Sequence, residues 1–382
     1  MELTRIERRQ NLMKRRTLVI LGTAVLLILT GAVGSGYYYF QLEKERAART
    51  IYETYPSEKA DTLNLTVDGA AHVDIRVSDD DDIHLTQEGA LVEQNDFKRE
   101  VKTKNNETNV KITYSEPASQ TKKFFHNFNQ FTDETIQLRV PKSYQKIAVK
   151  GANVSVSLNT ITAKSIDIDS ENGSASLFDI TADELKFASH SGDIRIDDVF
   201  LEKDALLETR SGSINVEGFV FNTAQFVSSS GYLSLYELKT QAATDDKKAA
   251  EQITIKTSSG DMSLDTVQAN TLIENGSGEI DIRNIKGKLT AKNDHGGISI
   301  ESAQLTADAS LTTKNGDIYI SLSEDGWKKS QFSGETKLGD IYLDDEPQRN
   351  PYKKSASGPS ISATSNTGDI TLYTYRFEDY ED

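Results

Sequence analysis

The motif Asn315-Gly316-Asp317-Ile318-Tyr319-Ile320 returns with small changes as Ser191-Gly192-Asp193-Ile194-Arg195-Ile196. Each copy has a polar residue, a glycine, usually an acidic residue, and then apolar residues that alternate with variable ones. The motif occurs ten times, and most steps between successive glycines are 18 to 20 residues long. A fixed period in this range is typical of a solenoid. The ten glycines are Gly173, Gly192, Gly212, Gly231, Gly260, Gly278, Gly296, Gly316, Gly339 and Gly368.

A second alternating segment precedes each glycine. The positions seven and five residues before the glycine are apolar in most copies, as at Leu185 and Phe187, and the copy at Gly339 departs from this pattern. The positions two and four residues after the glycine are apolar in all ten copies. Because alternate residues of a strand point to one face, each unit is predicted to be two short strands with one buried face. We expect the glycine to form the turn between them, since glycine adopts positive φ easily.

These patterns predict an all-β fold, a single-stranded β-solenoid or β-helix-like stack of about ten coils of 18–20 residues. A lone hairpin of this size is marginal in water, so the coils must stack to bury a continuous core. With a spacing of about 4.8 Å, ten coils make a rod on the order of 45–50 Å long. An irregular β-sandwich is the alternative architecture.

The N-terminal region has the pattern of a membrane anchor. Residues 1–16 carry six basic and two acidic residues, and residues 17–40 carry no charge and end in Tyr37-Tyr38-Tyr39-Phe40. The uncharged segment is long enough to cross a bilayer, and the positive-inside rule places residues 1–16 in the cytoplasm. One N-terminal transmembrane helix and an extracytoplasmic remainder are therefore expected. A cleaved signal peptide is the alternative, because Ala32-Val33-Gly34 is a tolerable cleavage site.

The chain then divides by composition into four further segments. We expect a charged linker or stalk at 41–57, a β-rich N-terminal part of the ectodomain at 58–148, the solenoid repeats at 149–376 and an acidic tail at 377–382. The β-rich part should cap the N-terminal end of the stack, because the terminal units of a solenoid must differ from the internal ones. Tyr373, Tyr375 and Phe377 are expected to cap the other end. Strands are expected in the β-rich part at 63–67, 73–77, 83–85, 110–114 and 136–141.

This order of features resembles a known family. A basic N-terminus and one apolar span precede a strand pair around an acidic turn, then Ile136-x-Leu138-x-Val140-Pro141, then serial Ser-Gly-Asp-Ile-x-Ile units. The chain is similar to the bacterial "putative adhesin" family of β-strand-repeat proteins, long classed as a domain of unknown function, which includes LiaG-like membrane-anchored proteins. The resemblance covers about residues 60–375. It implies a β-repeat architecture and a gene encoded beside cell-envelope stress systems of Gram-positive bacteria. It supplies no catalytic residues.

Charge narrows the range of partners. The chain has 43 basic and 59 acidic residues, a net charge of −16, and without residues 1–16 the remainder carries −20. Such a chain does not suit nucleic acid, which requires basic patches. The expected partners are the membrane, through the N-terminal helix, and an envelope protein or wall component. The absence of cysteine excludes a disulfide framework, and no cofactor is expected.

Two groups of carboxylates are candidate cation sites. The run Asp79, Asp80, Asp81 and Asp82 offers oxygen ligands for Ca²⁺, although a solvated turn between two strands is the more common use of such a run. A second group follows the repeat glycines and would form a column of carboxylates along one edge of the stack. The alternative for this column is turn chemistry and solubility. Its members are Asp193, Asp261, Glu279, Asp317, Asp340 and Asp369.

Aromatic residues provide the candidate partner-binding sites. Phe124, Phe125, Phe128 and Phe131 follow two lysines in an otherwise polar segment, which suits a protein or membrane-surface contact, or a cap folded onto the sheet. Tyr319 and Tyr342 occupy equivalent outward positions in two successive repeats. We expect them to lie on adjacent coils as neighbours. Such a pair can receive a sugar ring or form a cross-strand contact.

Catalysis has little support in the sequence. The five histidines are dispersed without metal-ligand spacing, and no nucleophile elbow or phosphate-binding loop occurs. The sequence therefore favours a non-enzymatic, membrane-anchored, extracytoplasmic β-solenoid that acts as a cell-envelope accessory or scaffold, linked to the envelope stress response. An adhesin or wall-glycan binder is the main alternative. A polysaccharide-active β-helix enzyme is a remote one.

Overall fold

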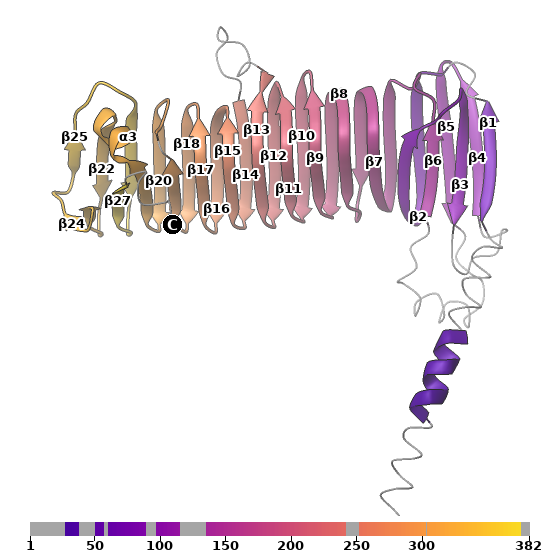
Figure 1. Cartoon of the computed structure of the whole chain (residues 1–382), viewed down its shortest axis with the longest axis horizontal. Helices are drawn as coiled ribbons and strands as arrows, with labels where there is room; N and C mark the ends of the chain where they lie inside the picture. Colours follow the sequence, from indigo (N-terminus) through magenta and orange to yellow (C-terminus); the bar gives the residue numbers. More distant parts are fainter. Residues whose placement is uncertain are drawn as a thin grey trace, which may run out of the picture.

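The computed structural model describes residues 27–37, 50–56, 60–88, 97–114, 135–241, 252–302 and 304–375. Almost all of these residues form β-strands, and the strands stack into one long rod (Figure 1). Residues 27–37 are helical, and a short helix, α3 (Glu324–Lys329), lies near the C-terminal end of the rod. The fold is therefore all-β, as predicted.

The strands fall into three groups along the rod. The N-terminal end contains β1 (Ile51–Pro56), β2 (Thr62–Val77), β3 (Asp82–Glu88), β4 (Phe97–Lys104), β5 (Glu107–Tyr114) and β6 (Thr135–Val140). The body contains β7 (Lys146–Ser170), β8 (Ala175–Ser191), β9 (Ile194–Leu201), β10 (Asp204–Ser211), β11 (Ile214–Phe221), β12 (Thr223–Ser230), β13 (Leu233–Thr240), β14 (Gln252–Ser259), β15 (Met262–Gln268), β16 (Asn270–Ser277), β17 (Ile280–Lys286), β18 (Leu289–His295), β19 (Ile298–Ser302), β20 (Ala309–Asn315) and β21 (Ile318–Ser323). The C-terminal end contains β22 (Gln331–Thr336), β23 (Ile341–Leu343), β24 (Glu346–Pro347), β25 (Tyr352–Lys354), β26 (Ser360–Ser365) and β27 (Ile370–Tyr375).

Successive coils pair in parallel and in register through the body. Ile214 pairs with Ile194 of the preceding coil and with Leu233 of the following coil, and the other strands repeat this arrangement. The strands before the glycines form one sheet, and the strands after them form the facing sheet. Alternate residues of both sheets point inward and build one continuous apolar core. A β-sandwich is excluded, because the neighbours within each sheet are equivalent strands of successive coils.

The repeat glycines stack on one another along one edge of the rod. A Cβ atom added to any of the ten would lie 1.9 to 2.4 Å from a backbone carbonyl oxygen of the neighbouring coil. Only Gly231, Gly260, Gly278 and Gly296 have positive φ. The expectation that positive φ explains the glycines is thus wrong for the other six. Close backbone approach excludes a side chain at all ten positions.

Polar side chains buried beside this edge bond the glycine carbonyls. The residue three positions before each glycine points inward, and in most coils it donates to the glycine of the coil before it. Thr209 Oγ1 donates to Gly192 O over 3.1 Å, and Asn293 Nδ2 donates to Gly278 O over 2.7 Å. Because an unpaired buried carbonyl destabilises a fold, this polar column belongs to the core as much as the apolar ones do. Its members include Ser189, Thr209, Ser228, Asn275, Asn293, Thr313, Thr336 and Ser365.

Coils in the first part of the body bend a second time, six residues after the glycine. The backbone there is left-handed, with φ between 50° and 64° in six successive coils. Asp and Asn tolerate this conformation better than other non-glycine residues, which accounts for part of the composition of this column. The six residues are Asp179, Asp198, Gly218, Glu237, Thr266 and Asn284.

Antiparallel strands close the N-terminal end of the rod. β4 pairs with β5 in one sheet, and β1 pairs with β3, which pairs with β6, in the other. Arg99 of β4 forms an ion pair with Glu53 of β1 over 3.3 Å and so joins the two sheets across the end of the core. Burial, together with a hydrogen bond to Glu53, raises the pKa of Tyr55 to about 12. The last apolar layer is therefore covered by a neutral tyrosine and a paired arginine.

The C-terminal end does not follow the order of the sequence. β26 lies between β20 and β22, and β27 lies between β21 and β23, so the last coil of the chain is the penultimate coil in space. The segment that contains α3, β22 and β23 forms the outermost coil, and the antiparallel strands β25 and β24 complete it. β23 flanks β27 only from Ile370 to Leu372, and beyond that point Tyr373 and Tyr375 pair with β21 alone, so their capping role stays a prediction. Phe377 lies outside the described residues.

The structure leaves the expected anchor untested. Among the described residues, no helix combines the length and the apolar composition needed to cross a bilayer. The described helix at 27–37 covers less than half of the predicted span at 17–40, and the rest of that span, like the basic tail at 1–16, lies outside the described residues. The transmembrane helix stays a prediction from the sequence.

Substitution of a repeat glycine tests the close stacking of the coils. Gly316→Ala places a methyl group 2.1 Å from Gly296 O without any requirement for positive φ. We expect it to lower the free energy of unfolding by about 1–3 kcal/mol, as overpacking does in a rigid core. Thr312→Ala, at an exposed position of the same coil, is the matched control and should be nearly neutral. Equal stability of the two variants in thermal denaturation would contradict the stacking.

Truncation tests the inserted C-terminal coil. A chain that ends at Pro359 lacks β26 and β27, so β22 and β23 lose their parallel neighbours. We expect residues 324–359 of this variant to become rapidly cleaved by protease, whereas a chain that ends at Tyr375 should resist cleavage like the full chain. If both truncated chains resist equally in a time course analysed by mass spectrometry, the insertion is not what holds this end together.

Candidate functional site

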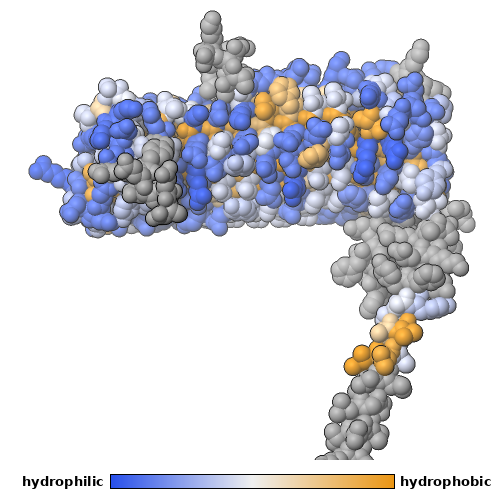
Figure 2. All heavy atoms as spheres, viewed as in Figure 1, coloured by the Kyte–Doolittle hydropathy of each residue, from blue (hydrophilic) through white to orange (hydrophobic). Residues whose placement is uncertain are grey.

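The face of the rod that Figure 2 shows consists mainly of hydrophilic side chains, with hydrophobic ones between them. The large hydrophobic residues that remain exposed in the body include Phe178 (44%), Phe200 (41%) and Tyr236 (41%), and no two of them share a strand. A rod of this kind offers flat, repetitive faces to a partner. Its candidate sites are therefore surface patches defined by columns of side chains.

A shallow hollow of about 410 Å³ lies on the outer face of β12, β14, β16 and β18. Its lining includes Ser229, Ser258 and Gly276, which occupy one column two positions before the repeat glycines. Because these residues are small, the surface is lower here than in the neighbouring coils. No residue that lines the hollow is aromatic.

Charges surround the hollow and are largely paired across strands. Lys256 forms an ion pair with Glu274 over 3.1 Å, and Asp294 forms one with Lys314 over 2.7 Å. The site thus offers hydroxyl groups and balanced charges in a shallow trough that follows the rod. This composition suits a polar, extended ligand better than an apolar one.

The two tyrosines singled out in the sequence are not neighbours. Tyr319 and Tyr342 both pair with Thr371, which therefore lies between them. The prediction that they lie on adjacent coils is wrong, because β27 inserts between β21 and β23. The ring of Tyr319 instead packs against Tyr373 of β27, with centroids 5.4 Å apart and the planes tilted by 40°.

Carboxylates lie close to Tyr342 and Tyr373. The hydroxyl of Tyr373 donates a hydrogen bond to Asp345, which raises the pKa of that tyrosine. The negative charges of Asp340 and, less strongly, Asp369 raise the pKa of Tyr342. Tyr373 was expected only as a cap, and its contact with Tyr319 was missed, because this contact becomes visible only once the last coil is placed out of order. Tyr342 and Tyr373 therefore stay neutral within a negative potential, which disfavours anionic ligands at this surface.

The carboxylates that follow the repeat glycines have a structural role. Asp193 Oδ1 accepts the backbone N–H of Ser213 over 2.8 Å, and Asp317 Oδ1 accepts that of Asp369 over 2.8 Å. The same bond recurs where Asp261, Glu279 and Asp369 face the next coil. These five acids therefore each hold the neighbouring turn, and this compensates for part of the repulsion between like charges one coil apart.

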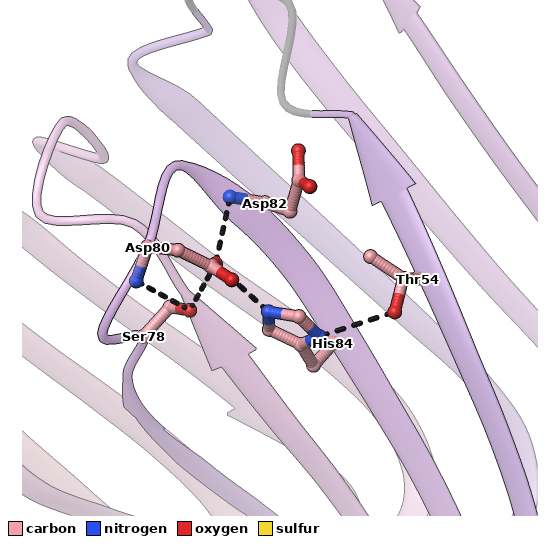
Figure 3. A network of polar contacts seen from close by, with 5 residues as sticks. All are labelled: Thr54, Ser78, Asp80, Asp82 and His84. Carbon is pink, nitrogen blue, oxygen red and sulfur yellow. Dashed lines mark hydrogen bonds and ion pairs between the residues drawn. The ribbon is translucent and has the colours of Figure 1, made fainter.

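The run of four aspartates forms the turn before β3, and only Asp80 is held by several bonds. Asp80 Oδ1 accepts hydrogen bonds from Ser78 Oγ over 2.9 Å and from the backbone N–H of Asp82 over 3.0 Å, and it lies 2.8 Å from His84 Nε2 (Figure 3). These three interactions, with that of His84 the largest, lower the pKa of Asp80 to about 2. Asp79 and Asp81 are exposed.

His84 extends this network to the first strand. Its Nδ1 atom lies 3.2 Å from Thr54 Oγ1 of β1, so hydroxyl, imidazole and carboxylate follow one another (Figure 3). The order is that of a nucleophilic triad, but the carboxylate is already occupied by the turn that it closes. The geometry therefore fixes the turn and joins β1 to β3. This network was not found from the sequence, because Thr54 and His84 are 30 residues apart and meet only through strand pairing.

No group of three or more His, Cys, Asp or Glu side chains is arranged to hold a metal ion within the described parts of the chain. Calcium binding at Asp79 to Asp82 has no further support from the geometry and stays a prediction. Phe124, Phe125, Phe128 and Phe131 lie outside the described residues, so their contact role also stays a prediction. That segment leaves β5 at Tyr114 and returns to β6 at Thr135.

The chain belongs to the family described as Toastrack DUF4097, whose model matches residues 60–245 and 240–373. This confirms the resemblance to a β-strand-repeat family that was inferred from the sequence. Comparison with curated proteins gives no match.

Solved structures from three bacteria are similar over most of the chain. A "putative cell adhesion protein" from Clostridium sporogenes is 10% identical, covers 86% of this chain and 99% of its own length, and has a TM-score of 0.22. A "putative adhesin" from Bacteroides fragilis is 15% identical (86% and 97% covered, TM-score 0.35), and a "putative lipid binding protein" from Parabacteroides distasonis is 12% identical (86% and 97% covered, TM-score 0.41). At these values the three structures carry no argument about function, and the assignment rests on the family model.

The bond between Asp80 and His84 predicts how acid affects this turn. Because the folded pKa of Asp80 lies below its ordinary value of 3.8, its contribution to stability is present above about pH 4 and is lost as the pH falls through about 2. We expect His84→Ala to raise the pKa of Asp80 towards 3.8 in a carboxyl NMR titration. Asp79→Asn, at an exposed neighbour, is the control. An unchanged titration of Asp80 in His84→Ala would show that the imidazole does not hold it.

Proposed function

We propose that this protein is a membrane-anchored, extracytoplasmic scaffold of the bacterial cell envelope, without enzymatic activity and linked to the envelope stress response. The observation that carries the proposal is the unbroken parallel ladder from β2 to β27, which makes one stiff rod with a continuous core. Such a rod holds a partner at a fixed distance from its point of attachment. The uncharged span at 17–40, flanked by basic residues, supports attachment at the N-terminal end.

The chemistry of the faces supports a role in binding rather than in catalysis. The carboxylates of the turn edge are occupied by backbone N–H groups, and the polar column beside them is occupied by glycine carbonyls. These groups are therefore used to hold the coils together. What remains for a partner is a set of outward side chains at a regular spacing, which suits an extended surface contact.

The hollow across β12 to β18 favours a second candidate function, the binding of a wall glycan. Its hydroxyl groups and paired charges can bond sugar hydroxyls without attracting one sign of charge. In that case the rod would be an adhesin or glycan-binding protein whose ligand lies along the face. The two functions differ in whether a protein partner or wall material is recovered with the chain.

In-cell crosslinking of the full-length protein separates these functions. We expect mass spectrometry to recover an envelope membrane protein, in larger amount after treatment with a cell-wall antibiotic, and not from a variant that lacks residues 1–40. A variant with Lys256→Ala and Lys292→Ala in the hollow should keep this partner. Recovery of wall fragments alone, unchanged by the antibiotic and reduced by the two lysine substitutions, would instead establish the glycan-binding function.

A further inference from the structure

The outer face of the first four strands of one sheet is rich in lysine, although the chain as a whole is acidic. The strands are β4, β5, residues 62–68 of β2 and residues 146–150 of β7, which pair in this order. Their outward positions hold six lysines against three carboxylates. The lysines are Lys98, Lys102, Lys104, Lys111, Lys146 and Lys150, and the acids are Asp68, Glu100 and Glu107. We call this surface the lysine face.

Strand register keeps these lysines on one side. Leu65, Val110 and Val149 point into the core, so the residues beside them in these strands point outward. The remaining outward positions are filled by small or neutral side chains, including Thr66 and Asn109. The face is therefore a flat, exposed patch with a positive charge.

Most of the lysines on this face keep their charge available. Lys102 pairs with Glu100, and Lys111 pairs with Asp68 over 3.6 Å. Within the described parts of the chain, Lys98, Lys104, Lys146 and Lys150 have no ion-pair partner. The acidic part of this sheet begins in the next coil, where Asp167 and Asp169 point outward and Asp167 pairs with Lys186 over 3.8 Å. Charges farther away than about 10 Å are screened at physiological salt.

The two sheets carry opposite charge at this end of the rod. The outward positions of β3, β6 and residues 72–76 of β2, in the facing sheet, hold three acids (Asp74, Asp82 and Glu88) against two arginines (Arg76 and Arg139), and the exposed Asp79 and Asp81 lie in the turn before β3. The end of the rod is thus polarised from one face to the other. A polarised end orients itself against a charged surface, with the lysine face towards an anionic one.

Topology places the lysine face near the proposed anchor. β4 lies beside β1, to which it is joined by the ion pair between Arg99 and Glu53. Thirteen residues separate the helix that ends at residue 37 from Ile51, and even when fully extended they span only about 50 Å. If residues 17–40 cross the membrane, the lysine face is held within reach of the lipid surface.

We infer that the lysine face binds the anionic headgroups of the bilayer in which the chain is anchored, and so sets the rod at a defined orientation to the membrane. The inference rests on the proposed anchor. Charge complementarity and the short connection to the N-terminal helix favour lipid over a more distant polyanion.

Fluorescence quenching in proteoliposomes tests this contact on the full chain. The protein has no cysteine, so Thr66→Cys places one fluorophore at the centre of the lysine face. We expect lipids with a nitroxide headgroup to quench it several-fold more in vesicles that contain phosphatidylglycerol than in pure phosphatidylcholine, and high salt to abolish the difference. A label at Thr312→Cys, on the same sheet far along the rod, should not be quenched in either.

Two sets of substitutions complete the test. A variant in which the four unpaired lysines of the face are all changed to Gln should lose the quenching and keep its circular dichroism spectrum. These lysines are Lys98, Lys104, Lys146 and Lys150. The control is a variant with the same change at four lysines that are exposed on the same face farther along the rod, and it should keep the quenching. These lysines are Lys186, Lys292, Lys314 and Lys337.

The outcomes separate this inference from the anchor. If the chain floats with both kinds of vesicle but the label at position 66 is quenched equally in both, the anchor holds and the lipid contact is wrong. If the chain floats with neither, both are wrong. If soluble polyphosphate changes the label while anionic vesicles do not quench it, the face binds a phosphate polymer and the assignment to lipid is overturned.

Discussion

Every coil of the rod lies about 4.8 Å from the next, and this spacing is the constraint on which the other features depend. Because the strands pair in register, each residue of the body faces its equivalent in the neighbouring coil. A residue type fits a given position only if it can lie about 4.8 Å from the equivalent residue of the next coil. The glycine edge shows this most directly, since a Cβ atom at Gly192 would meet the carbonyl of Gly173 at 2.1 Å.

The same constraint explains the polar columns. A hydroxyl or amide three positions before the glycine reaches the carbonyl of the preceding coil, and a carboxylate one position after it reaches the N–H of the following coil. Apolar columns need no such matching. On the outer faces, opposite charges in adjacent coils pair across strands, as Lys256 does with Glu274. The turn edge is therefore held by directional bonds and the interior by burial.

The sequence predicted the repeating features and most strands of the N-terminal part, and it missed single contacts between residues that are distant in the chain. The period and the alternation of apolar residues indicated the coils, the turn glycines and the inward positions correctly. The left-handed bend had a signal in Asp179, Asp198 and Asn284, which a comparison of all ten copies would have found. β4 was not predicted, because its inward residues Arg99, Val101 and Thr103 lie at the open end of the core and are only partly apolar. The network around His84 and the pair of Tyr319 with Tyr373 required strand partners that no local pattern specifies.

The order of the last coils shows why local patterns fail at the ends. The copies at Gly339 and Gly368 each satisfy the motif, so periodicity alone stacks them in sequence order. What reverses them is the segment from α3 to β25, where the copy at Gly339 also has Gly334 in place of an inward apolar residue. In this coil Phe332 packs against Trp327 and Tyr352 instead of continuing the regular core. That aromatic cluster completes an end and cannot accept another coil, so the more regular copy at Gly368 takes the interior place. The irregularity of one repeat therefore determines both the cap and the position of the C-terminal strand.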